Sequence, residues 1–570
     1  MRGVFLIVGS LIINFCLAVI FYQQWGDSSE MVLIASVIGL GSKTFVMICS
    51  CVGAVAALPF TIFFIDTLLN MQKKSSKWNQ WIMSSKAFWF CCVISAMGLL
   101  TMIMFAFSKC IELDEAFSLA LVRHNYGDLI RLTGMDVHPP LYYLILKTVL
   151  DGGRLCFPEI PSVYLAKLVS VVPYIVLLGA GMTKVRKNWG NYVAGMWMLC
   201  VVGMSYLIDY GIKIRMYSWS VLFVTFVFLS MNDIVCKKNK VSWLKLVIFS
   251  LAAAYTHYYA CIAAGVCYLT LLVWFVMNDR KQLKKWCFAA MVTIGAYLPW
   301  LFVLINQLHT VSNDYWISDL TVPTVLYYFA YAFDNPLFLF LCLFMVIQWM
   351  REWKREIFGD WTQFFSMSGL LIPVGVILVG TIASVMIRPV FIYRYEIPAL
   401  ACLWLAFFIG MVIKKKEWAV EGAFCLAVLA SVARICAFSY TEQKDDIQSE
   451  DTCAFLDANG ENTIYICGSA DLYGLMVLEE MSGCQCYILE KEIDDVFFQV
   501  YEKIDTLYQF EEIAAFLSQG KNVYFMGDRE KADKFVYDSG LELAEAGSYQ
   551  VRGFFEFYQI LPGTSSNDSP

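Results

Sequence analysis

Residues 87–110 read AFWFCCVISAMGLLTMIMFAFSKC, and residues 113–144 just after them read LDEAFSLALVRHNYGDLIRLTGMDVHPPLYYL. The first segment is apolar over about 20 residues, the helical length that crosses about 30 Å of hydrocarbon. The second segment begins with two adjacent carboxylates, Asp114 and Glu115. A membrane span is therefore expected to end at a pair of acids, and the rest of the chain indicates what such a pair does there.

The composition of the whole chain is that of a polytopic α-helical membrane protein. Of its 570 residues, 59% are hydrophobic and 16% are charged, whereas soluble proteins carry about 25% charged residues. The first apolar run is too long for a signal peptide and lacks a small-residue cleavage site. The segment 31–41 is apolar but short, and we expect an interfacial segment or a half-span there. We predict 13 spans, at 4–22, 43–68, 87–108, 162–182, 191–210, 214–232, 243–258, 259–277, 286–305, 325–350, 364–386, 395–413 and 419–438.

Basic loops predict the orientation of these spans. Cytoplasmic loops carry an excess of Lys and Arg, and counting spans puts six basic loops on one side, at 71–77, 183–187, 236–240, 278–285, 351–356 and 414–418. The N-terminus is then cytoplasmic. Asp114, the segments 306–323 and 387–394, and everything after residue 438 are then extracytoplasmic. The Lys-rich inner loops suit a bacterial plasma membrane.

The tail of the chain has a different composition. Residues 441–570 contain 26 Asp and Glu against 8 Lys and Arg, a formal charge of −18, which leaves +12 on the other 440 residues. Strand-like runs that end in Gly, at 462–468 and 521–527, alternate with helical patterns, which predicts a soluble α/β domain with a partly parallel sheet. We find no catalytic motif in this tail and expect an accessory or binding module. Its cysteines, Cys453, Cys467, Cys484 and Cys486, could pair with one another, and the CQC spacing fits no zinc pattern.

These observations divide the chain into three predicted parts. Residues 1–85 hold two N-terminal spans and a basic cytoplasmic loop. Residues 86–440 form the main membrane domain, with a long outer loop at 109–161. Residues 441–570 form the acidic extracytoplasmic domain.

The outer loop carries a second group of polar residues. DVHPPLYY, at 136–143, places Asp136 and His138 before two prolines that begin a helix. That helix is too short for a span, so we expect it to lie in the membrane interface. An acidic pair at a membrane boundary also suits a simple helix N-terminal cap. Because Asp136 and His138 lie on the same predicted side of the membrane as Asp114 and Glu115, a site at the membrane surface is favoured.

Arginines lie at the predicted outer ends of two spans. Arg215 lies in DYGIKIRMYSWS, at 209–220, and Arg388 and Arg394 lie in RPVFIYRYEIPAL, at 388–400. A boundary Arg also occurs wherever a side chain snorkels to the interface. Because Arg binds phosphate with two parallel hydrogen bonds, arginines that converge at the outer surface could hold a lipid-linked phosphate.

Further candidates lie among aromatic residues at the predicted outer boundaries. YTHYYA, at 255–260, contains His257 and Tyr258, and NDYWIS, at 313–318, contains Trp316. Tyr and Trp form an interfacial belt in any membrane protein, and a single His is more often an interhelical residue than a ligand. The alternative to these structural roles is that the aromatic side chains stack on sugar or lipid.

Seven motifs resemble, in their order along the chain, those of the GT-C membrane glycosyltransferases. They are LDEA, DVHPPLYYLIL, RMYSWSVLF, THYYA, YLPW, YWI and RPVFIYRYEIPAL. The resemblance is greatest to the family 39-like branch, which includes protein O-mannosyltransferases and aminoarabinose transferases, and it covers about residues 87 to 410. It implies a GT-C-type membrane fold and a polyprenyl-phosphate sugar as donor. The two N-terminal spans and the acidic tail depart from the family pattern.

The resemblance also implies roles for individual residues of the outer loop. The acid of the first outer loop is the catalytic carboxylate in such enzymes, which corresponds to Asp114, with Glu115 beside it. The HPP segment shapes the loop around the acceptor, which implicates His138 and its neighbour Asp136.

Two further motifs imply contacts with the donor phosphate. The RMY motif corresponds to Arg215 and Tyr217, and the RY motif corresponds to Arg394 and Tyr395. Both arginines would stabilise the charge that develops on the leaving phosphate.

The expected reaction is the transfer of one sugar to an extracytoplasmic glycan, lipid or protein, with inversion and with Asp114 as general base. A divalent cation near the acids is left open, since their spacing shows no dedicated cage.

The rival class is a transporter or flippase for a lipid-linked sugar, which would explain many spans and boundary arginines. Transporters, however, place polar sites near the midplane, often between repeated halves, and the chain shows no internal repeat. A non-catalytic scaffold for polysaccharide export would not need this set of acids, arginines and His-Pro-Pro.

Overall fold

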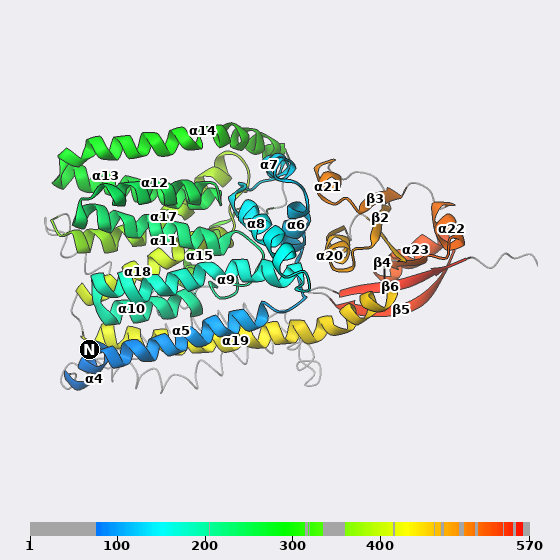
Figure 1. Ribbon diagram of the computed structural model, residues 1–570, viewed down its shortest axis with the longest axis horizontal. Coiled ribbons are helices and arrows are strands. Elements are labelled where there is room, and N and C mark those ends of the chain that lie inside the picture. Colours follow the sequence, from blue (N-terminus) through cyan, green and yellow to red (C-terminus); the bar gives the residue numbers. More distant parts are fainter. Residues whose placement is uncertain are drawn as a thin grey trace, which may run out of the picture.

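The computed structural model describes residues 76–204, 206–313, 317, 320–333, 359–413, 417–460, 462–468, 472–489, 495–507, 511–539, 541–550 and 554–562. The predicted spans 4–22 and 43–68, the short segment 31–41 and most of the span 325–350 lie outside the described residues. Figure 1 shows a helical bundle at one end, a smaller domain at the other, and the helices α6, α7 and α8 between them.

The membrane bundle and the helices beside it are built from long helices joined by short connections. Their bounds are α4 Ser76–Ile82, α5 Ser85–Phe105, α6 Leu113–Arg123, α7 Tyr126–Met135, α8 Leu141–Cys156, α9 Ser162–Ala180, α10 Arg186–Gly203, α11 Tyr217–Lys237, α12 Lys240–Ala254, α13 Tyr258–Asn278, α14 Leu283–Asn313, α15 Val322–Tyr331, α17 Trp361–Met386, α18 Ile397–Ile413 and α19 Glu417–Asn459. Single-turn elements lie at Gly181–Val185, Arg280–Gln282 and Tyr393–Glu396.

Among the described residues, eight helical segments are long and apolar enough to cross a membrane. One of them, Ser162–Gly203, contains two predicted spans that meet at Gly190. Gly190 has a φ of +85°, a conformation that side chains with a Cβ rarely adopt, and it breaks the helix between those spans. The chain is a multi-pass helical membrane protein, as its composition predicts.

Helix α18 forms the centre of the bundle, because it is apolar on every side. Nearly all of its residues are buried, against α10, α11 and α17, as expected for a helix without a polar face. Helix α14 lies at the opposite extreme. Its exposed apolar side chains, among them Phe288, Ile294 and Phe302, form a surface suited to lipid.

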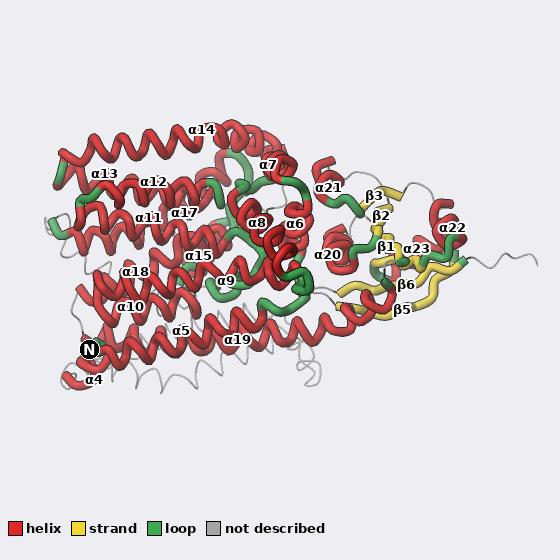
Figure 2. Tube along the Cα trace, in the orientation of Figure 1, coloured by secondary structure: helices red, strands yellow, loops and turns green. Residues whose placement is uncertain are grey.

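The C-terminal domain is α/β and contains all the strands of the described residues (Figure 2). The strand order is β3-β2-β1-β4-β6-β5, with β1 to β4 parallel and β5 and β6 antiparallel, which confirms the predicted partly parallel sheet. Cys453, Cys484 and Cys486 are free thiols. The bounds are β1 Thr463–Gly468, α20 Leu472–Ser482, β2 Gln485–Leu489, α21 Asp495–Val500, β3 Ile504–Leu507, α22 Glu511–Ser518, β4 Asn522–Met526, α23 Arg529–Ser539, β5 Glu542–Gln550 and β6 Phe554–Leu561.

Helix α19 joins the bundle to this domain. It has 43 residues, a length of about 65 Å at 1.5 Å per residue, and it lies beside α5 in the bundle before it reaches the sheet (Figure 1). Residue 440, where the sequence predicts a domain boundary, lies inside this continuous helix.

The C-terminal domain also packs on the helices that follow the span α5. Arg123, at the end of α6, donates two hydrogen bonds to the Glu479 carboxylate, of 3.0 and 2.7 Å, and lies 2.9 Å from Glu480. A ring nitrogen of His124 lies 3.0 Å from the carbonyl oxygen of Val500. The domain therefore contacts the C-terminal end of α6, the helix that carries the predicted acids.

Candidate active site

The first turn of α6 sets the direction of the acids. The Glu115 carboxylate accepts a hydrogen bond of 2.8 Å from the backbone N–H of Glu112, which closes a capping box. Its other oxygen accepts one of 2.9 Å from the N–H of Ile214. Glu115 is fully buried, so this side chain joins α6 to the segment between α10 and α11, and it faces backbone amides.

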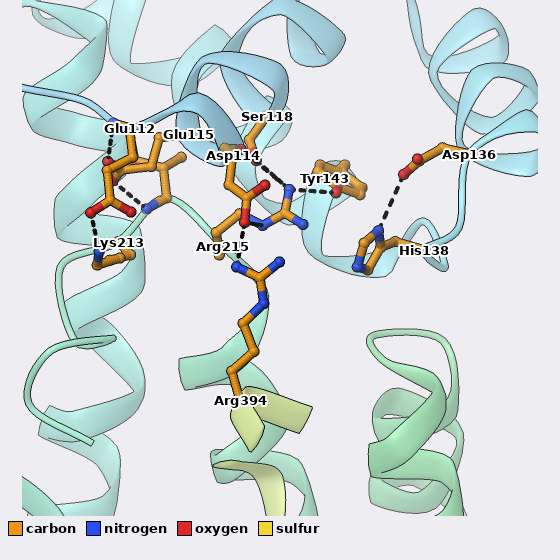
Figure 3. A network of polar contacts seen from close by, with 11 residues as sticks. Glu112, Asp114, Glu115, Ser118, Asp136, His138, Tyr143, Lys213, Arg215 and Arg394 are labelled. Carbon is orange, nitrogen blue, oxygen red and sulfur yellow. Dashed lines mark hydrogen bonds and ion pairs between the residues drawn. The ribbon is translucent and has the colours of Figure 1, made fainter. Parts of the chain in front are cut away.

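Asp114 lies between two arginines (Figure 3). Nη1 of Arg394 lies 2.8 Å from Oδ2 of Asp114, and Nε of Arg215 lies 3.9 Å from the same oxygen. Arg215 also donates to the backbone carbonyl of Asp114, at 3.2 Å. Three residues that are 101 and 280 positions apart in the chain thus meet at one carboxylate.

The charges around Asp114 control its ionisation. Burial disfavours the carboxylate, but the positive charges of Arg215 and Arg394 outweigh burial and lower the pKa of Asp114 below its ordinary value. Asp114 is therefore an ionised carboxylate over the whole neutral range of pH.

Arg215 is itself buried and held from several sides. Its Nη1 lies 3.4 Å from the Tyr143 hydroxyl and 3.5 Å from the Ser118 hydroxyl. Tyr217, the first residue of α11, has a buried hydroxyl for which the described residues provide no hydrogen-bond partner. A buried hydroxyl without a partner is costly, and Tyr217 interacts electrostatically with both Arg394 and Arg215.

Asp136 and His138 form a second polar pair (Figure 3). Nδ1 of His138 lies 3.2 Å from Oδ2 of Asp136. Burial lowers the pKa of His138 against the opposing effect of this contact with Asp136, so the imidazole is neutral at neutral pH. His138 lies near His257, with ring centroids 6.1 Å apart.

A cavity of about 280 Å³ lies beside this pair. Its lining is mostly apolar and aromatic and includes His138, His257, Tyr258 and Tyr395. Tyr395 stacks on Tyr259 with ring centroids 4.9 Å apart. The sequence-predicted residues His257 and Tyr258 thus lie together with His138 around one cavity, which we term the apolar cavity.

The remaining predicted residues lie elsewhere. Arg388 lies in the segment 387–392 between α17 and the turn Tyr393–Glu396. Trp316 lies outside the described residues. No group of three His, Cys, Asp or Glu residues that could hold a metal ion occurs within the described part of the chain.

Two charged residues of the site, Glu112 and Lys213, were not predicted from the sequence. Lys213 forms an ion pair with Glu112, so that a second charged contact lies beside that of Asp114 (Figure 3). The signals were present, because Glu112 makes ELDE a run of three acids in four residues and Lys213 lies two residues before Arg215. Neither signal shows which partner each residue takes.

The helical bundle with its C-terminal α/β domain has a fold of the GT-C class. Similar solved structures include two crystal structures of ArnT from Cupriavidus metallidurans, one in the apo state and one bound to undecaprenyl phosphate. Their TM-scores are 0.52 and 0.50, and each is 10% identical to this chain. They cover 85% and 84% of this chain, and the matches span 100% and 99% of the ArnT chains. The sequence matches no protein-family model and no curated protein. At this identity the likeness shows the fold.

Proposed function

We propose that the protein is a membrane glycosyltransferase of the family 39-like branch, which moves a sugar from a polyprenyl phosphate to an acceptor hydroxyl or amine. The observation that carries the proposal is the Asp114 carboxylate held between Arg394 and Arg215, with Tyr395, the residue after Arg394, lining the apolar cavity. The GT-C fold supports it, as does the undecaprenyl phosphate bound to one of the similar ArnT structures.

The donor phosphate would bind to the two arginines. Arg215 and Arg394 meet at one point and present planar donors suited to phosphate. Tyr217 offers a buried hydroxyl close to both. The polyprenyl chain would enter the apolar cavity, whose lining of His257, Tyr258 and Tyr395 offers few charges to desolvate.

Asp114 would act as the general base. In the structure its carboxylate is the counter-ion of both arginines, and a bound phosphate would compete for them and release the carboxylate. The acceptor oxygen then attacks the anomeric carbon, its proton passes to Asp114, and the bond from that carbon to the phosphate oxygen breaks. The electron pair of that bond stays on the phosphate, and Arg215 and Arg394 stabilise the charge. Attack opposite the phosphate inverts the anomeric centre.

Other residues would support this chemistry. Glu115 ties α6 to the segment that carries Arg215, through Ile214 N–H, so we assign it a positioning role. Asp136 orients the imidazole of His138, which lies at the apolar cavity. We propose that this side of the protein, with the C-terminal domain, is extracytoplasmic, because the basic loops predict that orientation. We also propose that residues 1–85, 86–440 and 441–570 are the three parts of the chain that the sequence predicts.

The test expresses the wild-type protein or the Asp114→Asn variant in a strain that lacks the chromosomal gene and measures the transfer of the sugar. Wild-type protein should restore one sugar residue to an envelope glycan, lipid or protein, seen as a mass difference. The variant should lose at least about 100-fold in transfer, since a general base contributes about 10² to 10⁴.

Asp128→Asn is the matched control, because Asp128 is an exposed acid on the neighbouring helix α7. It should transfer at the wild-type rate. Equal membrane levels of the three proteins show that the loss is chemical. Full turnover by Asp114→Asn would refute the proposal and would favour a flippase, which needs no base.

A further inference from the structure

A second cavity, of about 390 Å³, is lined by both members of the Glu112–Lys213 ion pair. Its lining comes from the segment between α10 and α11, from α15, from the turn Tyr393–Glu396 and from α19, together with Glu112. We term it the polar cavity.

The polar cavity and the apolar cavity are both lined by residues next to those of the Asp114 cluster. Along the turn Tyr393–Glu396, Tyr393 lines the polar cavity, Arg394 pairs with Asp114, and Tyr395 lines the apolar cavity. Lys213 and Glu112, which pair with each other beside Asp114, line the polar cavity as well. The reacting groups of the proposed mechanism therefore lie between two cavities of different chemistry.

Charge excludes an alkyl chain from the polar cavity. Six charged side chains line it: the carboxylates of Glu112, Asp209, Glu442 and Asp445 and the cations of Lys213 and Arg434. Covering these groups with hydrocarbon would desolvate them without replacing their contacts with water, which is unfavourable for every charge. The carboxylates outnumber the cations, so a negatively charged ligand is disfavoured too.

Aromatic rings supply the other half of the lining. Tyr206, Tyr210, Tyr327, Tyr331 and Tyr393 all contribute to it. A tyrosine offers a flat apolar face and a hydroxyl at its rim, which matches the apolar C–H face and the hydroxyl edge of a pyranose. The rings of Tyr327 and Tyr393 lie 6.0 Å apart in a T-shaped arrangement, and both are partly exposed.

One wall of the polar cavity is held in a strained conformation. Tyr206 has a φ of +60°, which is uncommon for a residue with a Cβ. Its ring is stacked on Tyr331 at 4.4 Å, and the Arg434 guanidinium covers it at 4.2 Å. Strain of this kind persists only where surrounding contacts hold it, and it gathers at binding sites.

We infer that the polar cavity binds the acceptor, and that the acceptor end presented there is a carbohydrate without acidic groups. The inference rests on the proposed transferase function and adds the chemical class of the acceptor. Tyr327 would stack on the sugar ring, and the carboxylates would accept hydrogen bonds from its hydroxyl or amino groups.

The test measures binding without donor, on the full chain in lipid nanodiscs, by saturation-transfer NMR. The probes are a neutral glucose trisaccharide, a glucosamine trisaccharide and a galacturonic acid trisaccharide. The neutral and amino probes should bind, and the acidic probe should not. Tyr327→Ala should weaken binding about fivefold, the worth of one aromatic contact, whereas Tyr327→Phe keeps the ring and should retain affinity.

Tyr126→Ala is the matched control, because Tyr126 on α7 is 44% exposed, close to the 47% of Tyr327, and lies outside both cavities. It should bind like the wild type. Failure of both the neutral and the amino probe to bind, stronger binding of the acidic probe, or binding indifferent to Tyr327→Ala would each overturn the inference. Asp114→Asn separates this inference from the proposed function, since that variant should bind the probes while it loses transfer.

Discussion

At the scale of single residues, the site depends on one carboxylate shared by two guanidinium groups. A carboxylate paired with two cations is a weak base, because its proton affinity falls with its pKa. Asp114 becomes a useful base only when another anion takes over Arg215 and Arg394. We therefore expect the lipid phosphate to bind before the acceptor is deprotonated.

The pH dependence of transfer should report this coupling. Arg394 lowers the pKa of Asp114. The wild-type kcat/KM should therefore fall only at pH values below the ordinary pKa range of aspartate. Arg394→Ala removes one lowering charge, and the acidic limb of kcat/KM should move to higher pH, together with a raised KM for the donor. Steady-state rates at pH values from about 2.5 to 8, a window that extends below the ordinary aspartate pKa of about 3.9, measure both effects.

Arg388→Ala serves as the control, because Arg388 lies six residues earlier, before the turn Tyr393–Glu396. It should leave the acidic limb in place. A common shift in both variants would mean that bulk surface charge, and no specific contact of Arg394, sets the pKa of Asp114.

The sequence predicted the residues of the site better than their contacts. Asp114, Arg215 and Arg394 could be selected because they lie at the same predicted side of the membrane and their motifs occur in the order of the resembling family. The partners of Glu115 and Lys213 could not be predicted, because they depend on the path of the irregular segment between α10 and α11. The polar cavity could not be predicted for a similar reason, since its residues come from five separate parts of the chain.

At the scale of helices, close packing around α18 holds the site in place. The turn that carries Arg394 leads directly into α18, and α17 packs against α18 through Gly369. A Cβ at Gly369 would lie 2.5 Å from Cβ of Ala406 and 3.1 Å from the carbonyl oxygen of Cys402. Small residues permit such close approach of helices within membranes.

Gly369→Ala should therefore destabilise the bundle by about 1 to 3 kcal/mol, the usual cost of overpacking. Gly295→Ala is the natural comparison, because Gly295 lies within α14 and a Cβ there would meet nothing within 4 Å. That variant should be neutral or more stable, since Ala favours helix over Gly. Thermal unfolding in detergent measures both, and equal midpoints would contradict the packing argument.

Hydropathy located the helices well and their ends less well. The predicted span 364–386 and the helix Trp361–Met386 agree to within three residues. The predicted span 419–438 is only the first part of α19, because the rest of that helix is polar and carries no hydropathy signal. Helix α14 likewise extends past its predicted end at 305 to Asn313.

At the scale of the whole molecule, the C-terminal domain holds the helix that carries Asp114. The link is Arg123, whose partner Glu479 is fully buried. Burial raises the pKa of the neighbouring Glu480 to about 7 against the opposing charge of Arg123. Without Arg123, at least one buried carboxylate would therefore keep an uncompensated charge.

Arg123→Met should loosen this interface. Breaking one partner of a buried pair costs about 3 to 5 kcal/mol, and the partial exposure of Arg123 reduces that figure to roughly 2 to 3 kcal/mol. Limited proteolysis of the C-terminal domain and thermal unfolding should both show the loss, and kcat should fall with an unchanged KM for the donor.

The double variant Arg123→Met with Glu479→Met provides the control. Replacing both members with apolar side chains of similar size removes the stranded charge of Glu479, although Glu480 remains, so part of the stability should return. If the double variant is no more stable than Arg123→Met, the ion pair does not hold the domain in place.

The pairing of Arg123 with Glu479 also has a consequence for biosynthesis. The two residues are 356 positions apart, so the ribosome completes the whole membrane bundle before the partner of Arg123 exists. Until then, α6 lacks the support of the C-terminal domain and is held only by its contacts within the membrane bundle. The nascent chain would thus gain this support for α6 only after the residues that contain Glu479 have been made.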